Sequence, residues 1–345
     1  MKTLFPKKEN EGRQMKIVQV LEAHPPAMDC AIALGNFDGL HVGHVRVIRA
    51  AVNSPGLHGA VFTFQENSHQ QPGLLMRADK EALIAEIGVE RLYSVSFEEV
   101  RDLSPEVFFR EILLKRCGAK KLCCGKDFRF GKEARGSVER LERLCGQAGI
   151  ELEVVPYVSQ EGERVSSTGI RKAIQEGDLA RANRMLGRPF GFVMEVIHGN
   201  HIGRKLGTPT VNQALPQGFL LPRFGVYVSV MSLRDRGPCG DVLSRIFSGA
   251  PAEDSYYGVT NIGVKPTVGS DRVLAETWMP EYTGAHLYGK KLRLYLYRFL
   301  RPERKFGSLE EMKTEILKNA AEAKAFLQGD CERPSGLLAG VERGS

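Results

Sequence analysis

Hydrophobic positions in the first half of the chain form short apolar runs that alternate with amphipathic stretches. Cys30–Leu34 is continuously apolar, which is typical of a strand buried on both faces. Val42–Val52 has the apolar spacing of a helix. Further strands are expected at 59–64, 91–97, 120–124 and 151–155, and further helices at 80–87, from 104, at 137–148 and at 179–186. This alternation predicts βαβ crossovers and a parallel sheet covered on both faces.

The pattern changes after Gly187. Short alternating strands are expected at 192–198, 225–231, 257–262 and 291–298, and helical spacing returns only at Ser308. Evenly spaced short strands predict an antiparallel β-barrel or sandwich. Ser308 and Glu311 form a capping-box pattern that opens a helix running to about residue 327. We therefore expect two domains, 15–187 and 188–328, with loosely ordered tails at 1–14 and 329–345.

Composition narrows the class of protein. The 345 residues are 42% hydrophobic and 26% charged, an ordinary globular mixture. No apolar stretch approaches the roughly 20 residues that span a bilayer. Seven cysteines without a C-x-x-C pair favour reduced thiols in a cytoplasmic protein over a disulfide framework or a zinc site. The net charge of +7 suits anionic ligands, but the charges are interspersed, so we expect no nucleic-acid or membrane partner and a monomer or weak homo-oligomer.

A glycine-punctuated turn follows the run that ends at Leu34. It contains Gly35, Asn36, Phe37, Asp38 and Gly39, and His41 and His44 come next as helical spacing begins. Backbone N–H groups at such a turn, together with the positive end of a helix, can hold phosphate. Imidazoles three residues apart can reach the same anion. The pattern predicts nucleotide chemistry; the alternative is an ordinary turn with two surface histidines.

Two later stretches can complete this site. In residues 125–131, Asp127 and Arg129 alternate with Phe128 and Phe130. Such charged and aromatic side chains could line a pocket for a planar ligand and its phosphate. The alternative is a loop anchored by two phenylalanines. The motif G-x-G-x-x-G is absent, which argues against a hydride-transfer enzyme.

The second stretch is a hydroxyl cluster at the start of a short helix. Ser166, Ser167 and Thr168 precede Arg171 by about one turn, which makes a second anion cradle or, alternatively, a plain helix cap. With the histidines, it suggests nucleotidyl transfer, in which a phosphate attacks the α-phosphate of ATP and pyrophosphate leaves. His41 and His44 would stabilise the α-phosphate region and Arg171 the departing phosphates.

A different chemistry is indicated in the second domain. Glycines recur every four residues in 199–207, with Gly203 and Lys205 among the candidates for phosphate binding. Thr210 and Asn212 are two apart, so on a strand they share a face and could hold Mg²⁺ with phosphate oxygens. Glu276, beside the only Trp, could be the general base for an alcohol nucleophile. The alternatives are a basic glycine-rich turn and a solvated glutamate.

Several motifs occur together in one order. They are G-N-F-D-G-L-H-V-G-H at 35–44, D-F-R-F-G at 127–131, S-S-T-G-I-R at 166–171, G-R-K-L-G-T-P-T-V-N at 203–212, N-I-G-V-K-P-T at 261–267 and L-R-P-E-R-K-F at 300–306. On these residues the chain resembles the bacterial bifunctional riboflavin kinase/FAD synthetase family over roughly residues 16–328.

The resemblance implies a Rossmann-like nucleotidylyltransferase domain that adenylylates FMN to FAD, and a six-stranded barrel that phosphorylates riboflavin to FMN. ATP would be the co-substrate of both reactions. It implies Mg²⁺ and ATP binding by Thr210 and Asn212, Glu276 as the base, and a mobile flavin flap that contains Arg301 and Phe306. Asp127 and Phe128 would lie on the flavin side of the adenylyltransferase site.

The chain departs from the family pattern after the expected strand at 59–64. The family reads T-F-E-P-H-P there, whereas residues 63–72 read T-F-Q-E-N-S-H-Q-Q-P, which alters the flavin side of the first site. Val211 and Trp278 are further departures. The alternatives are a riboflavin kinase with weak or lost adenylyltransferase activity and a flavin-binding regulatory protein. The intact Thr210, Asn212 and Glu276 argue for an enzyme.

Overall fold

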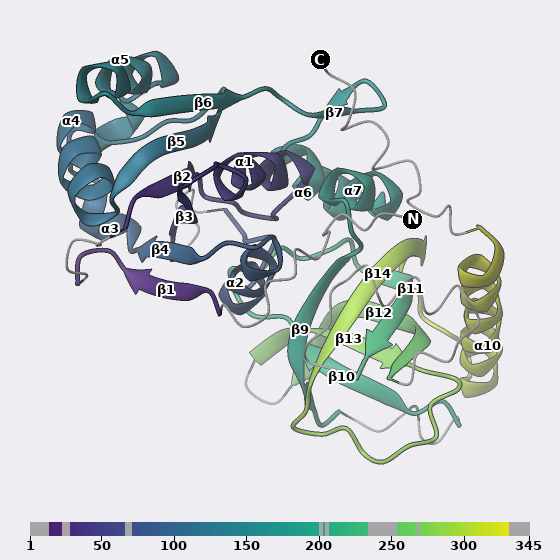
Figure 1. Ribbon diagram of the computed structural model, residues 1–345. Coiled ribbons are helices and arrows are strands. Elements are labelled where there is room, and N and C mark those ends of the chain that lie inside the picture. Colours follow the sequence, from purple (N-terminus) through teal and green to yellow (C-terminus); the bar gives the residue numbers. More distant parts are fainter. Residues whose placement is uncertain are drawn as a thin grey trace. The chain divides into compact units, whose positions relative to one another are not determined.

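The computed structural model describes residues 14–22, 28–65, 71–199, 203, 207–233, 254–267 and 270–330. The expected tails except residues 14, 329 and 330, together with residues 66–70, residues 234–253 and the candidate Lys205, lie outside these ranges. The chain divides into two compact units, one ending at Ser167 and the other beginning at Thr168, and each is described by itself (Figure 1). Within the described ranges, no helix has the length and apolar character that crossing a membrane requires.

The first unit is built on a six-stranded parallel sheet with the order β1-β4-β3-β2-β5-β6. The pairings between neighbouring strands are all parallel, which confirms the predicted sheet. The strands are β1 Lys16–Gln19, β2 Cys30–Leu34, β3 His58–Phe64, β4 Arg91–Val95, β5 Ala119–Gly125 and β6 Glu151–Val155. The helices are α1 Val42–Val52, α2 Arg77–Glu86, α3 Phe97–Val100, α4 Pro105–Val107, η1 Phe108–Arg116, η2 Lys132–Ala134 and α5 Val138–Ala148.

Helices cover both faces of this sheet because its central strand is apolar on both faces. From β2, Ile32 and Leu34 pack into a core with η1 and α5, whereas Ala31 and Ala33 pack into a second core with α1 and α2. Figure 1 shows α1 and α2 on one side of the sheet and α4 and α5 on the other. Five cysteines of the described residues are buried and free, and burial raises the pKa of the Cys123 thiol to about 12.

Strand order fixes the place where ligands are expected. The chain runs from β2 outward through β3 and β4, and then returns to pair β5 on the opposite side of β2. The order therefore reverses at β2, and the loops after β2 and β5 leave the same edge of the sheet. In doubly wound sheets such a switch point forms the ligand crevice. Gly35 follows β2 and Gly125 ends β5, so both predicted phosphate and flavin stretches begin there.

One helix differs in type from the sequence expectation. Ser104 caps α4, since its Oγ accepts a hydrogen bond from the Val107 N–H, as the Ser-Pro pair predicted. The helix then continues as the π-helix η1 over Phe108–Arg116.

The second unit is a closed barrel with the strand order β10-β13-β12-β11-β14-β9, and its pairings are antiparallel. The barrel, and not the sandwich, is therefore the correct alternative. Its strands are β9 Phe190–Ile197, β10 Thr210–Ala214, β11 Gly225–Ser232, β12 Ser255–Thr267, β13 Ser270–Trp278 and β14 Lys291–Arg301. The helices α6 Ser167–Glu176 and α7 Leu179–Leu186 precede the barrel, and α10 Leu309–Ala325 and η3 Phe326–Asp330 follow it.

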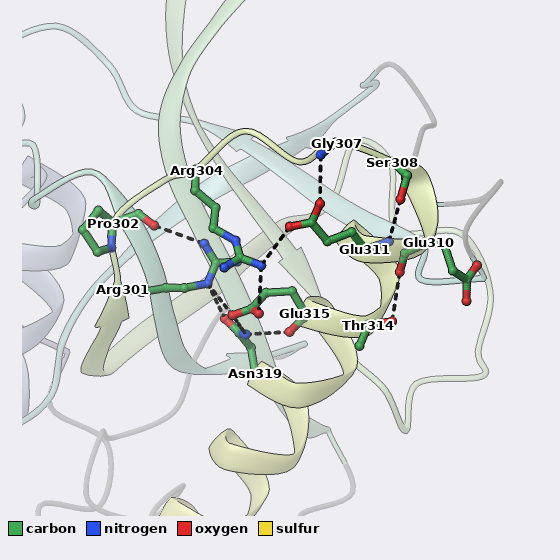
Figure 2. Close-up of polar contacts among 10 residues, drawn as sticks. All are labelled: Arg301, Pro302, Arg304, Gly307, Ser308, Glu310, Glu311, Thr314, Glu315 and Asn319. Carbon is green, nitrogen blue, oxygen red and sulfur yellow. Dashed lines mark hydrogen bonds and ion pairs between the residues drawn. The ribbon is translucent and has the colours of Figure 1, made fainter.

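The helix α10 covers the outer face of two barrel strands. Ala320 and Ala323 share a hydrophobic core with Val226 and Val228 of β11 and Val259 of β12. Ser308 accepts from the Glu311 N–H, as the capping box predicted. The reciprocal bond is shifted, because the Glu311 carboxylate accepts from the Gly307 N–H (Figure 2).

Candidate functional sites

The turn after β2 has an unusual backbone. Phe37, Gly39 and Leu40 have φ values of 52°, 80° and 42°, in the left-handed region that costs energy for side-chain-bearing residues. A Cβ at Gly39 would also lie 2.7 Å from Leu74 Cδ1, so the buried Leu74 side chain would have to shift. Strain of this kind is retained where the surroundings hold it.

Neighbouring strands and helices hold this turn at its carbonyl groups. The Asn36 carbonyl accepts from Thr63 Oγ1 at 3.0 Å and faces Lys80 Nζ at 3.4 Å. Lys80, of α2, is only 8% exposed and donates to the Phe64 carbonyl at 2.8 Å. The turn is therefore fastened to the carboxyl end of β3 through a buried ammonium group.

Asp38 connects the turn to two distant segments. Its Oδ1 accepts from the Leu74 N–H at 2.9 Å, and its carbonyl accepts from Ser167 Oγ at 2.8 Å. The hydroxyl cluster and the glycine turn, which the sequence places far apart, thus meet at Ser167. Ser166 directly precedes α6, while Thr168 and Arg171 lie on α6 in the second unit.

His41 and His44 form a stacked pair at the start of α1. Their ring centroids are 3.6 Å apart and their planes differ by 17°. His41 is the N-cap residue, and its Nδ1 accepts from the His44 N–H at 3.2 Å. Because Nδ1 accepts, the neutral His41 ring carries its proton on Nε2, where a phosphate oxygen can accept it. The ring of Phe37 meets His44 edge-on at 5.4 Å.

The stretch after β5 also has internal partners. Asp127 pairs with Arg164 of the β7–β8 hairpin (Ser159–Gln160 and Glu163–Arg164) at 2.6 Å. The Arg164 guanidinium lies 3.5 Å from the centre of the Tyr157 ring. Phe128 stacks on Phe130 with centroids 5.7 Å apart and planes 11° apart. A half-exposed ring beside a charged pair suits a planar, anionic ligand.

On the barrel, the candidate kinase residues gather on the outer face. Register places Glu276 of β13 directly opposite Asn212 of β10 on one side and Asn261 of β12 on the other. Thr210 is two residues from Asn212, so its side chain points to the same face. The intervening Thr277 is fully buried and bonds to Thr260.

Asn212 has the features of a ligand-binding residue. It is 5% exposed, and within the described ranges its Oδ1 has no hydrogen-bond partner. A Cβ at Gly199 would overlap the Asn212 amide, so Gly199 permits this close approach. A buried amide oxygen beside a hydroxyl provides neutral oxygen ligands of the kind that Mg²⁺ takes together with phosphate. These residues therefore fit the predicted ion. Gly203, of the glycine-rich stretch, precedes them along the chain.

The segment after β14 is fastened to α10 by charged groups (Figure 2). Arg301 Nε lies 3.0 Å from Glu315 Oε1 and 3.1 Å from Asn319 Oδ1. Arg304 Nη2 lies 3.1 Å from Glu315 Oε2, and its guanidinium lies 4.7 Å from the centre of the Phe306 ring. The hydrogen bond from Asn319, with the charges of both arginines, holds the pKa of Glu315 below its usual value.

Three residues near these sites were not identified from sequence. Lys80 stands in a helical stretch of ordinary appearance, Lys265 lies within the quoted motif at 261–267, and Glu303 lies within the motif at 300–306. The motif matches were an available signal for Lys265 and Glu303. Their contacts with Asn261 and Glu276 depend on strand register and on the path of the chain after β14, which no local pattern reveals.

The structure defines a protein that joins a doubly wound α/β domain, with a phosphate-type turn at its switch point, to a closed β-barrel. Comparison with known families agrees with both halves. The sequence model of FAD synthetase matches residues 24–169, and that of riboflavin kinase matches residues 186–327. A bifunctional riboflavin kinase/FMN adenylyltransferase from Pseudomonas fluorescens is 31% identical over 331 residues, covering 92% of this chain and 100% of the relative.

A relative of the same description from Bacillus subtilis is 32% identical over 312 residues, covering 85% of this chain and 90% of its own length. The chain therefore belongs to the family of bifunctional riboflavin kinase/FMN adenylyltransferases. Its fold is also similar to a crystal structure described as a macrolide-efflux protein from Streptococcus pneumoniae. That similarity has a TM-score of 0.76 and 25% identity, and it covers 90% of this chain and 98% of the other.

Proposed function

We propose that this chain makes FAD from riboflavin in two ATP-dependent steps. The barrel domain, residues 188–328, phosphorylates riboflavin to FMN, and the α/β domain, residues 15–187, adenylylates FMN to FAD. The observation that carries the proposal is the register of β10 and β13, which places Glu276 opposite Asn212, whose buried amide oxygen has no hydrogen-bond partner among the described residues. A carboxylate base beside a ligand for a phosphate-bound cation is what phosphoryl transfer to an alcohol requires.

In the kinase step, the Glu276 carboxylate takes the proton of the ribityl 5′-hydroxyl. The alcohol oxygen then bonds to the γ-phosphorus of ATP, the bond from that phosphorus to the bridging oxygen breaks, and ADP leaves. Thr210 and Asn212 would hold Mg²⁺, which when bound offsets the negative charge of the phosphates. Gly203 and Lys205 bind the ATP phosphates, and Arg301 and Phe306 contact the flavin.

In the adenylyltransferase step, an FMN phosphate oxygen bonds to the α-phosphorus of ATP as pyrophosphate leaves. The turn at residues 35–39 and the segment Ser166, Ser167 and Thr168 bind the ATP phosphates. His41 and His44 donate to the α-phosphate oxygens, and Arg171 offsets the charge of the departing pyrophosphate. Asp127 and Phe128 lie on the flavin side. Positioning and charge stabilisation carry this step, because no protein group forms a covalent bond.

We further propose that the protein acts in the cytoplasm on these small molecules, as a monomer or weak homo-oligomer without a nucleic-acid partner. A product assay with riboflavin, ATP and Mg²⁺ tests the function. FMN is expected first and FAD after it. FMN without FAD, even when FMN is supplied, would contradict the adenylyltransferase half, and the absence of any flavin nucleotide would contradict both.

A further inference from the structure

We propose that Lys265 is a positioning residue of the kinase site, which holds the Glu276 carboxylate in place for the reaction. This inference rests on the kinase activity proposed above. Lys265 Nζ lies 3.1 Å from Glu276 Oε2. Among the described residues, this ion pair is the one polar contact of the Glu276 side chain. Lys265 therefore fixes one carboxylate oxygen and leaves Oε1 for the hydrogen of the alcohol.

Strand register alone does not bring these two residues together. Asn261 is the residue of β12 opposite Glu276, whereas Lys265 is opposite Arg272. Since side chains alternate along a strand, Asn261, Gly263 and Lys265 share one face. Gly263 has no side chain, so the space between its two neighbours can take side chains from elsewhere. The long Lys265 side chain reaches back along this space to Glu276.

A second carboxylate occupies the same space and completes the arrangement. A Cβ at Gly263 would overlap the Glu303 carboxylate, which comes from the segment after β14. Glu303 Oε1 accepts from Asn261 Nδ2 at 2.9 Å and lies 3.8 Å from Lys265 Nζ. Lys265 thus lies between Glu303 and Glu276, and Glu303 is fastened independently by Asn261.

The three side chains form a series in which each positions the next. A base held by a second group, which a third group holds in turn, is a recurrent arrangement in enzymes with activated alcohols. Glu303 lies between Arg301 and Phe306, the two residues that we propose contact the flavin. The contact of this segment with β12, through Glu303, is therefore linked to the orientation of the Glu276 carboxylate. Through this link, Glu276 is fully ordered only when the flavin-side segment is in place.

A purely structural role predicts a different result. The side chains of Lys265, Glu276 and Glu303 are 31%, 28% and 37% exposed. Ion pairs this exposed contribute little to stability, so losing the pair should barely affect folding. A misplaced catalytic group, in contrast, can lower a rate on the order of 100-fold.

The test uses the full chain and measures FMN formation from riboflavin, ATP and Mg²⁺. Lys265→Met is expected to lower kcat on the order of 10- to 100-fold, with the KM for ATP changed less than about threefold. Lys265→Arg, which keeps the charge, should recover most of the activity. Lys291→Met is the matched control, because Lys291 is an exposed lysine of β14 that belongs to neither proposed site. In all these variants, FAD formation from supplied FMN should equal that of the unaltered chain.

A double-mutant cycle tests the series. Glu303→Gln alone should lower kcat by about three- to tenfold, because the loss passes through Lys265. Combined with Lys265→Met, it should add nothing to the effect of Lys265→Met alone. If the kcat losses of Glu303→Gln and Lys265→Met multiply in the double variant, Glu303 does not act through Lys265. If kcat of Lys265→Met stays within about twofold of that of the unaltered chain, the proposal is overturned. Failure of the proposed function looks different: the unaltered chain makes no FMN, or Glu276→Gln keeps full activity, and either result also removes the role of Lys265.

Discussion

The rings of His41 and His44 stack with their centroids 3.6 Å apart, and the backbone N–H of His44 donates to Nδ1 of His41. His41 thus has two tasks that can be separated. Its Nδ1 caps α1, and the neutral tautomer that this bond selects carries its proton on Nε2, the atom that we propose donates to a phosphate oxygen. Variants that keep one task and remove the other distinguish structure from chemistry.

His41→Asn should separate these tasks. Asparagine is a good N-cap residue, so the free energy of unfolding should change by less than about 1 kcal/mol. FAD formation from FMN and ATP should fall about 100-fold or more, because a donor to the α-phosphate is lost. FMN formation by the same preparation serves as the internal control. Equal loss of both activities would contradict the assignment of His41 to one site only.

Gly39→Ala should disrupt the turn itself. Gly39 has a φ of 80°, and an added Cβ would meet Leu74 at 2.7 Å. Gly56→Ala is the matched control, since Gly56 has a φ of 72° and nothing within 4 Å of an added Cβ. Both variants incur the left-handed backbone cost of about 1 to 2 kcal/mol, and Gly39→Ala should lose about 1 to 3 kcal/mol more. Chemical denaturation measures both, and only Gly39→Ala should also impair FAD formation.

Asn212→Ala should alter the metal requirement of one reaction. Its Oδ1 is buried without a partner in the described ranges, so its removal should affect folding little. Loss of a direct cation ligand should raise the Mg²⁺ concentration for half-maximal FMN formation by about tenfold or more. The Mg²⁺ dependence of FAD formation should stay unchanged. An unaltered Mg²⁺ titration for FMN formation would exclude Asn212 as a ligand.

The pKa of Glu315 is lowered by the hydrogen bond from Asn319 and by the charges of Arg304 and Arg301. A lowered carboxyl pKa stabilises the folded protein above the ordinary value of about 4.3, and this stabilisation is lost as the pH falls through the lowered pKa. Glu315→Gln should therefore destabilise the barrel by about 1 to 3 kcal/mol at neutral pH.

The measurement for Glu315→Gln is urea unfolding over a range of pH. The difference from the unaltered chain should be constant at neutral pH and shrink progressively below about pH 4.3. Glu322→Gln, at an exposed position of the same helix, should show little effect at any pH. A difference that is independent of pH would mean that packing, and not charge, accounts for the loss.

The sequence pattern predicted the strands and helices that are marked by their own residues. The strand Cys30–Leu34 and the helices Val42–Val52 and Leu179–Leu186 have the predicted bounds, because continuous apolar runs and clear caps mark them. The strand β1 was missed, since Lys16–Gln19 mixes charged and apolar residues at the edge of the sheet. The left-handed backbone of Phe37 and Leu40 was missed as well, because neither residue type indicates it.

The sequence predicted which residues belong to the sites, but not the contacts between those residues. Thr210, Asn212 and Glu276 were chosen by residue type and spacing, and register then brought Glu276 opposite Asn212. The contact of Ser167 with Asp38 crosses 129 positions, so only the fold could reveal it. The Lys265–Glu303 contact depends equally on tertiary structure, since it joins β12 to the segment after β14.

The barrel closes by pairing its first strand, β9, with its last, β14. This has a consequence for the order of folding during synthesis. The parallel sheet has all six of its strands once residue 155 is made, whereas β14 ends only at Arg301. Domains generally fold as units, the N-terminal one first. The adenylyltransferase domain can therefore complete its core on the ribosome while β9 and β11 still await their shared neighbour, so a chain stopped before β14 would leave both of these strands unpaired on one side.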